Sequence, residues 1–231
     1  MSLEKKRIEE LEDFAKKLKI KVNNLHIFNQ ALVHSSYAHE QKDSIECNEK
    51  LEFLGDAVLS LVTSEYLYQK FPKANEGSLS KLRARIVSEP VLSKNASQLV
   101  VGRYLLLGRG EEATGGRDRD SILANTFEAI IGAIYLDSGL GEAYKFIIEH
   151  MENEMNTCNI VDYKSQLQEW TQVKLKKIPI YRVIDEIGPE HEKIFDIELS
   201  IDNVIYGRGQ GKSKKQAEQL AAQMALVKLE K

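Results

Sequence analysis

Apolar residues recur at helical spacing through nearly all of the first 158 residues. An opening amphipathic helix is marked by Ile8, Leu11, Ala15 and Leu18, because side chains three and four positions apart share one face of a helix. Further helices are predicted over residues 31–36, 49–68, 78–87, 90–100, 122–136 and 141–155. Residues 102–120 are rich in glycine and charge, which predicts a long loop. This part of the chain is therefore expected to be all-α.

A different pattern follows the short polar stretch at residues 156–159. Asp162 can cap a helix that runs to Lys174, and Ser213 can cap a final helix that runs to Leu229. Strands are predicted between them over residues 179–187, 193–201 and 203–208. The expected fold class is α+β multidomain, with a helical domain over residues 1–158 and a small α-β-β-β-α domain over residues 159–231.

The composition is that of a globular protein. Of the 231 residues, 42% are hydrophobic and 29% are charged, with a net charge of −3, which argues against a general polyanion binder. Residues 207–215 nevertheless hold four basic residues and no acid, beside the predicted start of the last helix, where the helix dipole favours anions. Neither a secretory signal nor a membrane span is predicted, and two cysteines form no disulfide framework or zinc motif. A cytoplasmic protein with no membrane association is expected.

Three acids lie in a segment otherwise suited to burial. Glu49, Glu52 and Asp56 fall within an arc of roughly 60° on a helix, so their carboxylates share one stripe. The opposite face is apolar. A buried carboxylate costs several kcal/mol unless a basic partner, hydrogen-bond donors or a metal ion compensates its charge.

A second, nearly all-apolar helix over residues 121–137 carries Asn125 and Glu128 on one face. If the two helices pack together, Glu52, Asp56, Asn125 and Glu128 can converge, and Gly55 and Gly132 are compatible with a close approach. Oxygen-only ligands favour a hard divalent cation, Mg²⁺ or Mn²⁺, which suits phosphodiester hydrolysis. The structural alternative is that these acids only form salt bridges with Lys81, Arg83 or Arg85.

The segment NEKLEFLGDAVL, residues 48–59, closely resembles the signature of the ribonuclease III family. SILANTFEAIIGAIYLD, residues 121–137, resembles the second catalytic helix of that family. The resemblance covers essentially the whole chain, and its C-terminal part is similar to a double-stranded RNA-binding domain. It implies a Mg²⁺-dependent endonuclease, with Mn²⁺ as a substitute, that cuts double-stranded RNA in rRNA precursors and other structured RNAs. The implied products carry 5′-phosphates, 3′-hydroxyls and short 3′ overhangs.

The resemblance also assigns roles within the acidic site. The essential acids fall on Asp56 and Glu128, Glu52 is a further metal ligand, and Glu49 is a neighbouring acid that helps the site. The fourth family ligand is normally aspartate, and here it is Asn125. An amide offers one carbonyl oxygen and no charge, so we expect weak metal binding and impaired cleavage, with RNA binding retained.

The family resemblance further implies a homodimer formed through the helical domains. Phe53 matches an interface position of the family, and the alternative is an ordinary core phenylalanine.

RNA contacts are expected on the C-terminal domain, because duplex RNA is read through minor-groove hydroxyls and phosphates. Polar side chains at i, i+3 and i+7 of its first helix could meet one minor groove, a histidine in the first turn could reach the next, and a lysine cluster could bind phosphates. These residues are Ser165, Gln168, Gln172, His191, Lys212, Lys214 and Lys215. Each could instead be a merely solvated side chain. Trp170 is expected in the core.

Three arginines, Arg109, Arg117 and Arg119, lie in the glycine-rich segment before the second acidic helix. They could contact RNA or belong to a solvated loop. Two other functions compete with the nuclease: a non-catalytic homodimer that binds double-stranded RNA, and a carboxylate-bridged redox di-metal protein. The absence of a Glu-x-x-His pattern disfavours the second of these.

Overall fold

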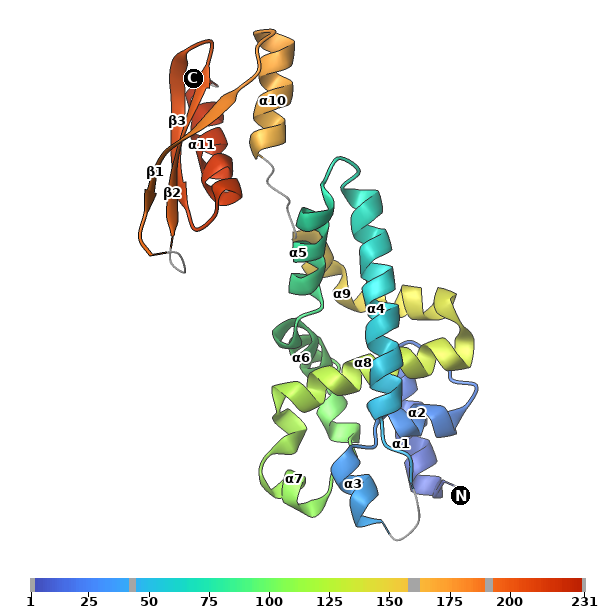
Figure 1. Cartoon of the computed structure of the whole chain (residues 1–231). Coiled ribbons are helices and arrows are strands. Elements are labelled where there is room, and N and C mark those ends of the chain that lie inside the picture. The colour runs from blue at the N-terminus through green and yellow to red at the C-terminus, as the bar shows by residue number, and fades with distance from the viewer. Residues whose placement is uncertain (1–2, 42–44, 158–162, 190–192, 230–231) are drawn as a thin grey trace. The chain divides into compact units, whose positions relative to one another are not determined.

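The structure is a computed structural model that describes residues 3–41, 45–157, 163–189 and 193–229. The chain divides into two compact units, residues 1–160 and 161–231. The boundary predicted between residues 158 and 159 lies outside the described residues. The fold class is as predicted, a helical unit followed by a three-stranded antiparallel sheet with helices (Figure 1).

The first unit is a bundle of helices around one apolar core. Its α-helices are α1 (Lys5–Lys17), α2 (Leu25–Ala31), α3 (Ser35–Glu40), α4 (Glu49–Lys70), α5 (Glu76–Ile86), α6 (Glu89–Gln98), α7 (Arg109–Ala113), α8 (Asp120–Ser138) and α9 (Leu140–Thr157). Helix α8 is buried along most of its length and packs against α2, α4, α6 and α9. Its nearly continuous apolar sequence therefore reflects a central position in the bundle. Within the described residues, no helix is both long enough and apolar enough to span a bilayer.

The helix predicted over residues 31–36 is wrong. Leu32 instead ends α2 in a turn, and residues 33–34 are extended backbone before α3, where Val33 pairs with Leu106 in an isolated parallel bridge. The amide of Leu106 donates to the Leu32 carbonyl at 2.9 Å, and that of His34 donates to the Leu106 carbonyl at 3.1 Å. The apolar run is buried by a partner about seventy positions away, which local periodicity does not reveal.

The long loop predicted over residues 102–120 is compactly folded. It contains two short 3-10 helices, η1 (Val101–Tyr104) and η2 (Gly116–Asp118), with α7 between them. Arg117 holds it together, since its Nη1 donates to the carbonyls of Gly102 and Leu105, both at 2.8 Å. The arginine also pairs with Glu112 at 2.6 Å, so its guanidinium serves the loop itself.

The second unit consists of α10 (Tyr163–Lys174), β1 (Ile180–Ile187), β2 (Ile194–Ile201), β3 (Val204–Gly211) and α11 (Lys214–Leu229). Its strand order is β1-β2-β3 (Figure 1). Strand β3 extends beyond the predicted 203–208 because it pairs with β2 as far as Gly211, which lies opposite Phe195. Gly207, Gly209 and Gly211 lie against α11, where a Cβ atom would collide. Trp170 is half-buried against the core of this unit, as expected.

Candidate metal centre and basic surface

Helices α4 and α8 approach each other at backbone distance. A Cβ atom added to Gly55 would lie 3.0 Å from the Gly132 nitrogen and closer still to the Glu128 carbonyl. A Cβ atom added to Gly132 would lie 3.2 Å from the Gly55 nitrogen and collide with the Leu51 carbonyl. The two glycines therefore allow the close crossing that the sequence suggested, and they bring residues 52–56 next to residue 128.

The predicted acids lie along this crossing with unequal burial. Glu52 and Glu128 are half-buried, whereas Glu49, Asp56 and Asn125 are exposed. The sequence pattern predicted a more buried α4, but the side of this helix that carries the acids faces solvent. An open acidic face leaves room for a large ligand such as a nucleic acid.

Electrostatic coupling links the acids of the two helices. Burial, followed by the charges of Asp56 and Glu52, raises the pKa of Glu128 to about 7. Burial is also the largest cause of the raised pKa of Glu52, the charge of Glu49 adds to it, and a hydrogen bond from the Asn125 side chain opposes it. The side chains of α4 and α8 thus interact, with an excess of negative charge between them.

The salt-bridge alternative is not supported. Among the described residues, no lysine or arginine forms an ion pair with Glu49, Glu52, Asp56 or Glu128. Of the proposed basic partners, Arg83 instead donates from Nη1 to Ser64 Oγ at 3.0 Å. Within the described part of the chain, these acids therefore have no ion-paired lysine or arginine to offset their repulsion.

The donor set fits a hard divalent cation. Carboxylate and amide oxygens are the ligands preferred by Mg²⁺ and Mn²⁺, and the mutual repulsion of the acids is what a bound cation would relieve. In the described ranges, no three His, Cys, Asp or Glu side chains are close enough to hold a metal ion by themselves.

The burial of the Glu128 carboxylate and its repulsion by Asp56 and Glu52 predict that the stability of the metal-free protein depends on pH. Its pKa is about 7 in the folded state, above its ordinary 4.5, so the folded state binds more protons between these values. Its contribution to stability is full below pH 4.5 and is lost as pH rises through about 7. We expect Glu128→Gln to stabilise the protein near pH 8 by about 1 to 2 kcal/mol, allowing for solvent screening, and to have little effect near pH 5.

Urea unfolding in EDTA at the two pH values measures this effect. The exposed Glu9 of α1 provides the control, and Glu9→Gln should leave the two curves unchanged relative to the parent. Equal stability of Glu128→Gln and the parent near pH 8 would show that the acids do not repel one another.

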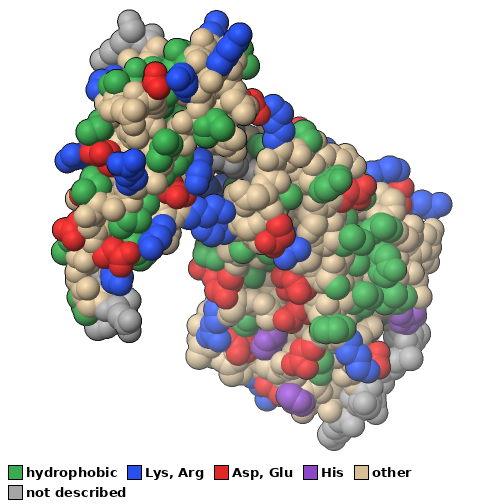
Figure 2. Space-filling view, turned by 45° about the horizontal axis from the view of Figure 1, so that its top comes forward, with side chains coloured by type: hydrophobic (Ala, Val, Ile, Leu, Met, Phe, Trp, Pro, Cys, Tyr) green, Lys and Arg blue, Asp and Glu red, His purple; other side chains and the backbone are tan. Residues whose placement is uncertain are grey.

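The predicted RNA-binding residues lie on the surface of the second unit. Ser165, Gln168 and Gln172 are exposed on α10, and Lys212, Lys214 and Lys215 are exposed where β3 leads into α11. Ser213 caps α11 as expected, because its Oγ accepts from the Gln216 amide at 3.2 Å. His191 lies outside the described residues. Figure 2 shows basic side chains interspersed with acidic ones on the second unit.

Three residues around Lys214 were missed by sequence reasoning. Glu186, Lys193 and Phe195 all contact its ammonium group or its ion-pair partner. They come from β1 and from the start of β2, and only the folded sheet brings them to the start of α11.

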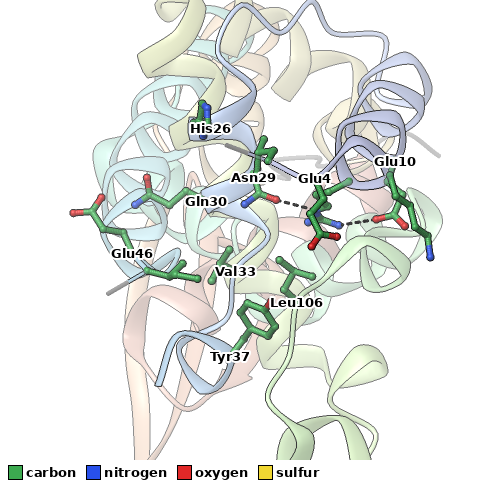
Figure 3. A pocket seen from close by; sticks show the side chains of 13 residues that line it. Glu4, Glu10, His26, Asn29, Gln30, Val33, Tyr37, Glu46 and Leu106 are labelled. Atoms are coloured by element: carbon green, nitrogen blue, oxygen red, sulfur yellow. Dashed lines mark hydrogen bonds and ion pairs between the residues drawn. The ribbon is translucent and has the colours of Figure 1, made fainter. Parts of the chain in front are cut away.

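A cavity of about 700 Å³ in the first unit was also missed, and no predicted site residue lines it (Figure 3). Arg7 lies in its wall, donates to Asn29 Oδ1 at 2.8 Å and pairs with Glu10 at 3.2 Å. Burial lowers the pKa of this guanidinium. The sequence carries no signal for the cavity, because its lining comes from α1, α2, α3 and separate loop residues.

Two of the three loop arginines are used within their own segment. Arg117 donates to two carbonyls of the loop and pairs with Glu112. Arg119 pairs with Glu111 and donates to Thr114 at 3.1 Å. Arg109 is exposed. The structure therefore favours a structural role for Arg117 and Arg119.

Comparisons with known proteins agree with this architecture. Residues 24–155 match the family model described as ribonuclease-III-like, and residues 163–229 match the double-stranded RNA binding motif. Ribonuclease 3 of Natranaerobius thermophilus is 47% identical, with 98% of this chain and 99% of the relative covered. Ribonuclease 3 of Bacillus licheniformis is 45% identical, with 98% and 92% covered.

A solved structure is similar to the first unit alone. The nuclease domain of ribonuclease III from Campylobacter jejuni has a TM-score of 0.58 at 41% identity, covering 62% of this chain and 97% of that domain. That domain is described as having a flexible region involved in dimer formation.

The helical unit with its acidic face, joined to a double-stranded RNA binding motif, defines the class as an endoribonuclease. The chain belongs to the ribonuclease III family.

Proposed function

We propose that this chain hydrolyses internal phosphodiester bonds of double-stranded RNA at the acidic face of α4 and α8. The observation that carries the proposal is the coupling of Glu52, Asp56 and Glu128 across the close crossing of these helices, without a basic partner for any of the three among the described residues. Water adds to phosphorus and the bond to the 3′ oxygen breaks, which leaves a 5′-phosphate and a 3′-hydroxyl.

Glu52, Asp56, Glu128 and Asn125 would hold the metal ion, and Glu49 would add negative charge beside it. A bound Mg²⁺, or Mn²⁺ in its place, supplies Lewis-acid polarisation of a phosphoryl oxygen and lowers the pKa of water. Glu128 must lose its proton to serve as a ligand, so its raised pKa makes metal affinity increase toward neutral pH. Asn125 contributes an oxygen without charge, which weakens the site and slows cleavage.

Two copies would act together on one duplex. Phe53 is 80% exposed on α4 beside the acids, which excludes its alternative role as a core residue and leaves it available for a dimer contact. Paired acidic centres facing opposite strands would produce short 3′ overhangs. The proposed role is the processing of rRNA precursors and other structured RNAs in the cytoplasm.

End-labelled RNA duplex incubated with this chain in Mg²⁺ and in Mn²⁺ tests the proposal. We expect slow cleavage that is faster in Mn²⁺, no cleavage of a DNA duplex, and, with the label at the 3′ end, labelled products that carry 5′-phosphates. Duplex binding without cleavage in either metal would favour the competing function, a non-catalytic RNA-binding homodimer.

The lysines at the start of α11 should bind phosphates through charge. We expect the double variant Lys212→Gln and Lys215→Gln to reduce the slope of log affinity against log salt by about 2, with similar losses for unrelated duplex sequences. Anisotropy titrations over a salt series provide the slope. Lys228→Gln, at the opposite end of the same helix, is the matched control and should keep the parent slope. An unchanged slope in the double variant would contradict these phosphate contacts.

A further inference from the structure

One carboxylate connects two separate elements of the second unit. Glu186, near the end of β1, pairs with Lys193 just before β2 at 2.7 Å and with Lys214, the first residue of α11, at 3.2 Å. The side chains of Glu186 and Lys193 are each 34% exposed, so this shared ion pair is only partly solvated. The three charges link the base of the β1–β2 connection to the start of the lysine cluster.

Lys214 is held by a second contact. Its ammonium group lies 5.4 Å from the ring centroid of Phe195, the residue opposite Glu186 in the β1–β2 register. Lys193 and Lys214 together lower the pKa of Glu186, which therefore stays charged at neutral pH. The carboxylate and the ring restrict the position of Lys214, so its ammonium is placed before any nucleic acid binds.

The linked elements are those expected to meet different parts of one duplex. A domain of this kind binds two successive minor grooves and the phosphates of the intervening major groove of A-form RNA. Lys193 and Lys214 must then be separated by a distance that suits A-form geometry.

We infer that Glu186 is a positioning residue that sets the spacing between Lys193 and Lys214, and so favours double-stranded RNA over double-stranded DNA. The inference rests on the proposed RNA-binding role of this unit and deepens it. It assigns a specificity role to an acid that pairs with Lys193 and Lys214.

Charge alone predicts the opposite behaviour for an acid at this place. A carboxylate near phosphates repels them, so its removal should strengthen any binding that depends only on charge. A loss of discrimination between RNA and DNA therefore separates positioning from simple repulsion.

The test uses the full chain in EDTA, so that no cleavage occurs, with RNA and DNA duplexes of one sequence. For Glu186→Gln we expect the ratio of RNA to DNA affinity to fall about fivefold, the upper range for an exposed ion pair. For Lys193→Gln we expect a fall of about twofold, because one of the two ties remains. The two variants change the net charge in opposite directions, so a common fall in the ratio cannot come from charge.

Glu198→Gln is the matched control. Glu198 lies on β2 and pairs with Arg208 at 2.8 Å, so its replacement makes the same change in charge without touching Lys214. Its affinity ratio should equal that of the parent. The inference would be overturned if Glu186→Gln raised the affinities for RNA and DNA equally, or otherwise left the ratio of RNA to DNA affinity unchanged. Failure of the parent to bind RNA would instead refute the proposed function, and thermal melting confirms that each variant is folded.

Discussion

Replacing Asn125 by aspartate is expected to raise the rate of RNA duplex cleavage in Mg²⁺ about a hundredfold, equivalent to about 2.7 kcal/mol of activation free energy. Asn125 lies on α8 three residues before Glu128, and its side chain opposes the rise in the pKa of Glu52, so it lies close to the acidic site. An aspartate there restores a charged oxygen ligand and increases the attraction for a divalent cation. Single-turnover cleavage of an end-labelled duplex, at several Mg²⁺ concentrations, measures both rate and metal dependence.

A second Asn→Asp variant, away from the acidic site, separates the effect of a new metal ligand from that of one added negative charge. Asn75 caps α5 by accepting from the Ser78 amide at 3.1 Å, and aspartate caps a helix equally well. Asn75→Asp should therefore leave cleavage and folding unchanged. RNA affinity in EDTA should be similar in the parent and in Asn125→Asp. Equal cleavage by these two proteins would refute the assignment of Asn125 to the metal site, and cleavage by neither would support the non-catalytic alternative.

The second large effect is expected from the glycines at the helix crossing. Gly55→Ala and Gly132→Ala should each destabilise the first unit by about 3 kcal/mol, because an added methyl group meets backbone atoms that cannot rotate away. Only separation of α4 from α8 can relieve the collision, and this would also separate Asp56 from Glu128. Urea unfolding of the first unit, followed by cleavage assays of whichever variant remains folded, measures both consequences.

Gly141 of α9 provides the control for these alanine variants. No atom lies within 4 Å of a Cβ atom added at this position, so Gly141→Ala should change stability by less than about 1 kcal/mol. If Gly55→Ala behaved like Gly141→Ala, the helices would not cross at backbone distance, and the proposed geometry of the acidic site would be wrong.

Much of the fold follows from the sequence. Helical spacing predicted α4 and α8 nearly to their ends, and the strands predicted over residues 179–187 and 193–201 match β1 and β2 within one residue. These elements are long and strongly patterned, so local rules suffice. The acids of the candidate site could be proposed together because i, i+3 and i+7 positions share a helix face. Their catalytic roles come from the family resemblance and stay predictions.

Long-range contacts explain where the sequence analysis was wrong. Residues 31–36 have a pattern compatible with a helix, yet pairing of Val33 with Leu106 makes residues 33–34 extended. Residues 102–120 have the composition of a flexible loop, yet Arg117 binds two carbonyls and folds the segment onto itself. In both cases the deciding hydrogen bonds join residues that local propensity does not relate.

By itself, the sequence determined the type of each major element, the order of two modules and which acids share a helix face. Tertiary structure decided that α4 and α8 cross at Gly55 and Gly132, that the acidic face is open to solvent, and that Glu186 holds Lys214. The physical reason is that periodicity describes the faces of one element. The choice of the element packed against each face depends on shape and charge from distant parts of the chain.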